Sequence, residues 1–167
     1  MANLEFCVDV AAEPNLVFAF FVPQRMPYWY AAEMESQFEV QGGASEFQPG
    51  QKVRITGKLR GREMSMTVVV TRYDWPRVLE WQFLDCYGVR GVQRWQVELA
   101  PPASSTRPEA PGASQGPATH VRMRDAYEMP GGLGKIVDWL LTRHSVSRRD
   151  RDALDRLKRL AERNPTE

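Results

Sequence analysis

Two ionisable side chains in this sequence combine a residue type and a position that suit proton chemistry. The first is Asp125, which lies between Met123 and Tyr127 in an alternating segment that directs all three side chains to one face. A carboxylate that faces inward is costly unless it is hydrogen-bonded or in contact with water. We therefore expect either a wet or ligand-filled pocket around Asp125, or a position near a solvated end of a sheet.

The second side chain is His144, near the C-terminus. It continues an apolar helical stripe, one turn after Leu140 or Leu141. A histidine there fits a core position with satisfied hydrogen bonds. It is also the residue type best suited to general acid or base work near neutral pH. Both interpretations remain open from the sequence.

A polar partner for Asp125 follows from strand pairing. If Leu99 faces Thr119 across the loop that joins their segments, Gln93 faces Asp125 directly. We hypothesise that Gln93, Asp125 and His144 converge on one cavity. Asp85 is a further inward candidate, near a strand end.

Other forms of chemistry have no signal in the chain. It contains no glycine-rich phosphate loop, no HExxH, no paired CxxC and no GxSxG. With only two histidines, a multi-histidine metal site is not expected, and no cofactor is predicted. The balance of 22 basic against 21 acidic residues argues against nucleic acid as a partner.

The elements that would position these residues begin with an amphipathic helix over residues 131–163. Its apolar positions recur at helical spacing: Leu133, Ile136, Val137, Leu140, Leu141, Leu154, Leu157, Leu160 and Ala161. A charged run at 142–152 interrupts the stripe and is expected to be a solvated face. Because Ser147 and Asp150 resemble a capping box, one helix and two helices broken near residue 146 both fit.

The preceding body is rich in alternating segments, which predict strands. They are expected at about 4–10, 33–40, 52–60, 63–73, 78–85, 90–99 and 119–128, with short helices after the first. A two-residue turn at Gly61 and Arg62 would pair Ile55 with Val68. The next two turns pair Val70 with Trp81, and Trp81 with Gln93. A curved antiparallel meander of about seven strands, closed over by the terminal helix, follows; the class is α+β.

Composition supports one domain over residues 1–167, since 43% of the 167 residues are hydrophobic. Residues 101–117 carry five prolines and no large aliphatic side chain, which predicts a flexible loop. Cys7 and Cys86 are expected to be reduced, buried thiols of a cytoplasmic protein. No apolar run reaches the length of a membrane span, which leaves only peripheral membrane contact open.

Three segments carry a family resemblance. They are the opening 8–14 (VDVAAEP) with Val17 and Phe18, the aromatic Pro27-Tyr28-Trp29, and the closing 154–162. Together with the order of elements, they resemble the helix-grip superfamily often called SRPBCC. It includes START lipid-transfer domains, polyketide cyclases and dehydratases, coenzyme Q-binding proteins and the birch-pollen-allergen group.

The resemblance implies a cavity between sheet and helix that holds a hydrophobic small molecule such as a lipid, quinone, isoprenoid or polyketide. Gly57, which lacks a side chain, and adaptable methionines would give room for it. The expected ligand-contacting residues all face inward: Phe38, Ile55, Gly57, Met66, Val68, Trp81, Phe83, Gln93, Trp95, Met123, Asp125, Tyr127, Val137, Leu140, Leu141 and His144.

Three functions are compatible with this interpretation. The first is a carrier or binding protein for a lipophilic ligand. The second is a cyclase- or dehydratase-type enzyme that uses His144 or Asp125 for proton transfer. The third is a membrane- or protein-docking module that uses the aromatic segment from Phe20 to Tyr30.

Overall fold

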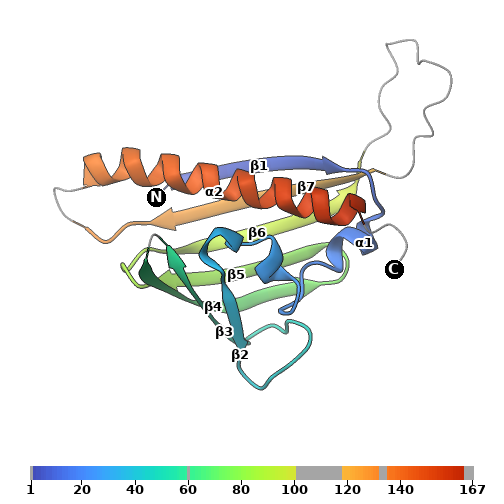
Figure 1. Cartoon of the computed structure of the whole chain (residues 1–167), viewed down its shortest axis with the longest axis horizontal. Coiled ribbons are helices and arrows are strands. Elements are labelled where there is room, and N and C mark those ends of the chain that lie inside the picture. The colour runs from blue at the N-terminus through green and yellow to red at the C-terminus, as the bar shows by residue number, and fades with distance from the viewer. Residues whose placement is uncertain (1, 60, 101–117, 132–134, 164–167) are drawn as a thin grey trace, which may run out of the picture.

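The structure, a computed structural model, describes residues 2–59, 61–100, 118–131 and 135–163, with the backbone alone at residue 2 and at 135–145. Its seven strands form one antiparallel sheet (Figure 1). The strands are β1 (Ala2–Val10), β2 (Gln37–Val40), β3 (Lys52–Leu59), β4 (Arg62–Asp74), β5 (Val78–Asp85), β6 (Arg90–Leu99) and β7 (Thr119–Glu128). The predicted loop at 101–117 lies outside the described residues.

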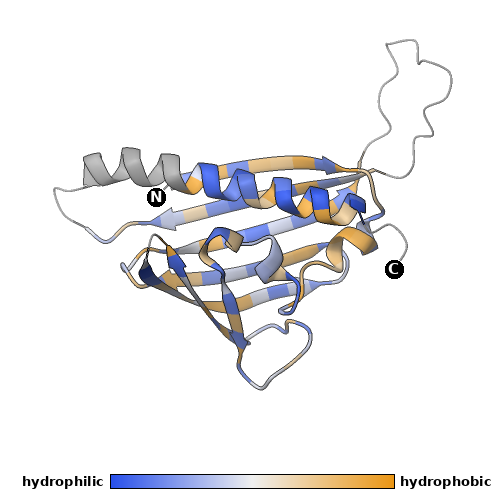
Figure 2. Ribbon diagram, in the orientation of Figure 1, coloured by the Kyte–Doolittle hydropathy of each residue, from blue (hydrophilic) through white to orange (hydrophobic). Residues whose placement is uncertain are grey.

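The strand order β1-β7-β6-β5-β4-β3-β2 is a meander, onto which the first strand is added beside the last. Most of the predicted register is confirmed: Val70 lies opposite Trp81, and Trp81 lies opposite Gln93. Gln93 in turn lies opposite Asp125. Since residues of one face alternate along a strand, this register keeps the inward set of each strand on the concave side. The alternation of hydrophobic and hydrophilic residues is visible along the strands in Figure 2.

The predicted turn between β3 and β4 is wrong by one residue on each strand. Leu59 pairs with Arg62, so residues 60 and 61 form the connection and Gly61 supplies its positive φ of 79°. Ile55 therefore lies opposite Met66, and Val53 lies opposite Val68. The partner of each β3 residue is therefore two positions away along β4 from the predicted one. Every side chain stays on its predicted face of the sheet, because the side-chain period of a strand is two.

Three short helical segments connect β1 to β2: α1 (Pro14–Phe18), η1 (Met26–Tyr28) and η2 (Ala32–Met34). Proline at the start of α1 fits, because the first turn needs no N–H there. The strand predicted from residue 33 is wrong over 33–36, where η2 replaces it. The residues that flank η2, Ala31 and Glu35, both adopt left-handed backbone angles, with φ of 52° and 50°. The change of chain direction at these two residues ends any extended segment there.

The C-terminal segment forms one helix, α2 (Lys135–Arg163), which runs along the β1 and β7 side of the sheet (Figure 1). The helix is continuous, so of the two alternatives the break near residue 146 is wrong. Leu154, Leu157 and Ala161 are buried, as their spacing predicts. The stripe residues 133–141 and His144 have no described side chains. At its C-terminal end, Lys158 Nζ donates to the Asp9 carbonyl at 2.6 Å, which ties α2 to β1.

An aromatic cluster fills the part of the concave face beneath α1 and the η1 segment. Trp81 and Trp95 contact edge to face with ring centroids 4.7 Å apart, and Phe21 and Trp29 pack against Trp95. Trp29 and Tyr30 are fully buried, whereas Tyr28 is 70% exposed. The aromatic segment proposed for docking is therefore mostly core.

Two further expectations concern compartment and membrane. Cys7 and Cys86 are free thiols, but both are exposed, so the expectation of burial was wrong. Neither lies on the buried face of its segment. Among the described residues, no helix is long and apolar enough to cross a membrane.

Gly57 gives a direct test of how η2 packs. A Cβ built on Gly57 would lie 2.6 Å from the backbone oxygen of Met34, which is too close for any real contact. Gly57→Ala should therefore lower the free energy of unfolding by about 1–3 kcal/mol, as overpacking does. Urea denaturation measures it, with Lys58→Ala on the exposed face of the same strand as control. Equal stability of the two variants would contradict this packing.

Candidate functional site

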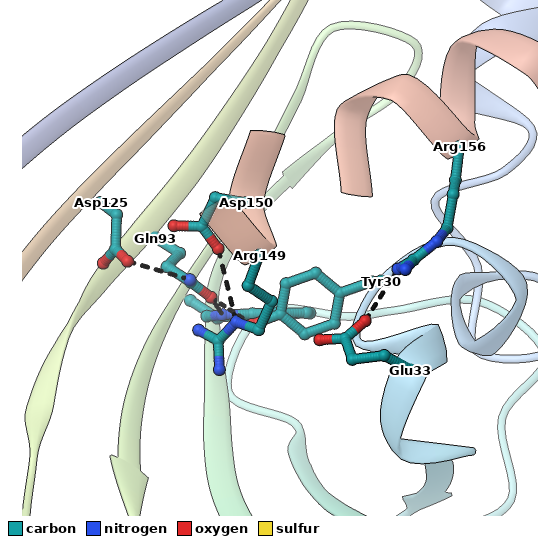
Figure 3. A network of polar contacts seen from close by, with 8 residues as sticks. Tyr30, Glu33, Gln93, Asp125, Arg149, Asp150 and Arg156 are labelled. Atoms are coloured by element: carbon teal, nitrogen blue, oxygen red, sulfur yellow. Dashed lines mark hydrogen bonds and ion pairs between the residues drawn. The ribbon is translucent and has the colours of Figure 1, made fainter. Parts of the chain in front are cut away.

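A small, partly open cavity lies between the sheet, η2 and α2. Its volume is about 90 Å³. Most of its lining is apolar, and the described lining residues are Tyr30, Ala31, Met34, Ile55, Met64, Ser65, Met66, Phe83, Asp85, Val89, Gln93, Asp125, Tyr127, Val146 and Arg149. The polar members Tyr30, Gln93, Asp125 and Arg149 gather on one side, which we call the polar wall (Figure 3).

Gln93 is the centre of the polar wall. Its Oε1 accepts one hydrogen bond from the Tyr30 hydroxyl at 2.7 Å and another from Trp81 Nε1 at 3.0 Å. Two donors on one oxygen determine which end of the amide is the carbonyl. The Nε2 group must therefore point toward Asp125, whose Oδ2 it reaches at 3.3 Å. These three hydrogen bonds fix the orientation of the Gln93 side chain in the absence of a ligand.

Asp125 is opposed by a second buried carboxyl group, that of Asp150 on α2. The two residues are 2% and 1% exposed, and the charge of Asp150 acts on Asp125 to raise its pKa. Among the described residues, Asp125 Oδ1 and both oxygens of Asp150 have no hydrogen-bond donor. Since like charges that are buried together disfavour ionisation, this arrangement favours a proton on one of the two carboxyl groups.

The surroundings of this pair favour a proton on one of the two carboxyl groups near neutral pH. Burial, together with the charge of Asp150, raises the pKa of Asp125 to about 7. Burial raises the pKa of Asp150 to about 6, against the opposing effect of Arg149. The two groups are coupled, so these values belong to the pair. A pair that loses its proton near pH 7 has the property that a general acid or base needs.

One ion pair lies within α2 beside the polar wall, and a second joins α2 to η2. Arg149 Nε lies 3.6 Å from Asp150 Oδ1, and Arg156 donates to Glu33 of η2 at 2.7 Å. Both are drawn in Figure 3. The η2 segment thus covers the cavity while a charge pair joins it to the closing helix.

The structure places six of the predicted ligand-contacting residues in the cavity lining. They are Ile55, Met66, Phe83, Gln93, Asp125 and Tyr127. Asp85 also lines it, but its Oδ1 accepts from the backbone N–H groups of Tyr87 and Val89 and so serves its own turn. Asp125 is buried away from solvent, so of the two expectations for it, the solvated sheet end is wrong.

Other predicted residues lie elsewhere. Val68, Trp81, Trp95 and Met123 are fully buried in the aromatic core, and Phe38 packs on the Tyr30 ring. The room expected above Gly57 is occupied by the backbone of Met34. The side chains of Val137, Leu140, Leu141 and His144 lie outside the described residues, so the hypothesis that His144 joins Gln93 and Asp125 stays a prediction.

Sequence reasoning missed three polar participants. Tyr30 was assigned to an aromatic patch, and Arg149 and Asp150 to a solvated charged run. For Asp150 that expectation was wrong, because its side chain is buried against the sheet. A signal was present: the helical stripe that contains Leu154, Leu157 and Ala161 extends backward through residue 150.

A family model described as polyketide cyclase/dehydrase and lipid transport matches residues 1–162. The chain belongs to this family. Comparison with curated proteins gives no match. The SRPBCC resemblance and the helix-grip fold are thereby confirmed, since the match spans nearly the whole chain.

Solved structures agree on the fold of this family member. A conserved protein from Geobacillus kaustophilus aligns with a TM-score of 0.69 at 10% identity, covering 97% of this chain and 96% of that one. Ara h 8.0201 aligns with a TM-score of 0.63 at 11% identity, covering 98% and 99%. DynU16, a protein from the dynemicin biosynthetic locus, aligns with a TM-score of 0.59 at 16% identity, covering 96% of this chain and 47% of that one. Such low identities show the fold alone.

The buried carboxyl pair predicts how stability depends on pH. The folded state retains a proton on Asp125 up to about pH 7, whereas an unfolded aspartate loses it near pH 4. The stabilisation by this group is therefore complete below about pH 4 and is lost as pH rises to about 7. Asp125→Asn removes the titration, so its stability relative to wild type should rise by about 3–4 kcal/mol between pH 4 and pH 7.5.

Denaturant unfolding across that pH range measures the difference. Asp152→Asn, a change at an exposed carboxyl group on α2, is the control and should follow the wild-type profile. A parallel profile for Asp125→Asn and wild type would show that Asp125 ionises normally.

Proposed function

We propose that this protein binds a hydrophobic small molecule, such as a lipid, quinone, isoprenoid or polyketide-like compound, in the cavity between the sheet and α2. The observation that carries the proposal is a small, mainly apolar cavity with one polar wall. In that wall, the buried Asp125 has an oxygen without a donor among the described residues. Ligand sites combine apolar lining with a few polar groups that fix orientation. Membership of a family associated with lipid transport supports the same assignment.

The cavity must enlarge to accept such a ligand. Its volume of about 90 Å³ is smaller than the roughly 300–1,000 Å³ of common ligand pockets. Met34 and Met64 separate it from an outer groove of about 610 Å³. Methionine side chains are flexible, and the left-handed residues on both sides of η2 store backbone strain. We expect the ligand to enter by displacing these methionines and η2.

A ligand titration tests the binding function. Wild-type protein should bind 1-octanol, with a change in the fluorescence of Trp81 and Trp95, and should carry an apolar molecule in native mass spectra after gentle purification. Val146→Phe adds bulk in the lining and should weaken octanol binding about tenfold, or about 1.4 kcal/mol. Leu84→Phe adds the same ring at an exposed position and should not. Absence of both octanol binding and a co-purified molecule would contradict the function.

A second candidate function is an enzyme of the cyclase or dehydratase type. The specific observation in its favour is the carboxyl pair, whose pKa values of about 7 and 6 suit proton transfer at neutral pH. In this mechanism, Asp125 removes a proton from a carbon beside a carbonyl group. Asp125, with Asp150 beside it, holds this proton until it returns to the same carbon. His144, the other catalytic candidate, stays a prediction.

Deuterium exchange isolates that step. Wild-type protein in D₂O should accelerate exchange at the central carbon of 2,4-pentanedione, as followed by NMR. Asp125→Asn should reduce the protein-dependent rate by about 100-fold, the usual contribution of a general base. Asp152→Asn should keep the full rate. Equal rates for wild type and Asp125→Asn would remove this mechanism without affecting the binding function.

A further inference from the structure

The charges around the polar wall do not balance when every group is ionised. Three carboxylates, those of Glu33, Asp125 and Asp150, lie near two guanidinium groups, those of Arg149 and Arg156. Glu33 is paired with Arg156 at 2.7 Å, and Asp150 is paired with Arg149 at 3.6 Å. One negative charge therefore remains, and it belongs to Asp125.

The cation that acts on Asp125 among the described residues is Arg149, which is already paired with Asp150. Among the described residues, no lysine, arginine or histidine forms an ion pair with Asp125, and Gln93 reaches only Oδ2. The Tyr30 hydroxyl already donates to Gln93, and burial raises the pKa of that hydroxyl, so it stays neutral. A buried carboxylate without a partner is strongly unfavourable. In the unliganded protein, a proton on Asp125 removes the charge.

We propose that the polar wall binds the ammonium group of an amphiphilic amine, which takes the place of the proton that Asp125 otherwise holds. The inference rests on the proposed binding function and names the class of head group. The ammonium group donates to Asp125 Oδ1, the buried oxygen without a donor among the described residues. The apolar part of the amine then lies against Met66, Phe83 and Ile55. A neutral alcohol would leave the proton on Asp125 in place.

The exchange of one cation for another makes binding depend on pH. With a pKa of about 7, Asp125 is about one-eleventh ionised at pH 6 and about ten-elevenths ionised at pH 8. An alkylamine stays protonated throughout, as lysine does. Its affinity should therefore rise about tenfold between pH 6 and pH 8. The affinity for an alcohol of the same length should not rise.

Octylamine and 1-octanol are a matched pair of probes for this experiment. Isothermal titration at pH 6, 7 and 8 should show octylamine binding at least tenfold tighter than octanol at pH 8. It should also show release of a proton, detected by comparing buffers of different ionisation enthalpy. Asp125→Asn should abolish the pH dependence and the preference for the amine. Asp152→Asn is the control.

The outcomes separate this inference from the binding function. Equal affinities for both probes at every pH would overturn the amine site and leave the binding function intact. Absence of binding by either probe would overturn both. If Asp125→Asn does not fold, as judged by circular dichroism, the wild-type comparison of the two probes and the proton release decide the question.

Discussion

The site depends on the fixed orientation of one buried amide. Gln93 accepts from Tyr30 and Trp81 with the same oxygen, so its nitrogen can only face Asp125. These donors come from segments far apart in the chain, one before β2 and one on β5. A buried polar group without partners is costly, and the loss of any member would leave others unpaired. The network therefore fixes Asp125 on the sheet before α2 contributes its own carboxyl group.

The division of the concave face into core and cavity follows from where bulky side chains gather. Trp81, Trp95 and the rings from the α1 and η1 region fill the space beneath those segments. Toward η2, the inward residues are methionines and smaller side chains, and a cavity of about 90 Å³ is left. Flexible methionines pack less rigidly than tryptophans, which makes this the region of the concave face best able to enlarge.

The closing helix contributes chemistry as well as cover. Asp150 meets Asp125 across the interface between α2 and the sheet, and Arg149 lies at the edge of the same cavity. Movement of α2 would therefore change the burial and the protonation of both carboxyl groups together. Family membership fixes the architecture but does not choose between carrier and enzyme, because function resides in the site and not in the fold. The carboxyl pair is the feature from which both proposals start.

The sequence by itself determined most of the strands and the meander, and it offered the pairing of Gln93 with Asp125 as one of several registers that the long loop allows. Period-two alternation fixes which face each residue occupies, and hairpin connections fix most of the register. The prediction from the sequence placed the β3–β4 turn one residue off. A shift of the pairing by two residues along β4 leaves every side chain on the same face, so the hydrophobic pattern does not distinguish the two registers. Only the tertiary structure decided that Asp150 opposes Asp125, that Tyr30 donates to Gln93, and that Met34 fills the space above Gly57. Those contacts join distant segments, and their geometry depends on how a helix or loop packs across the sheet, which local periodicity does not encode.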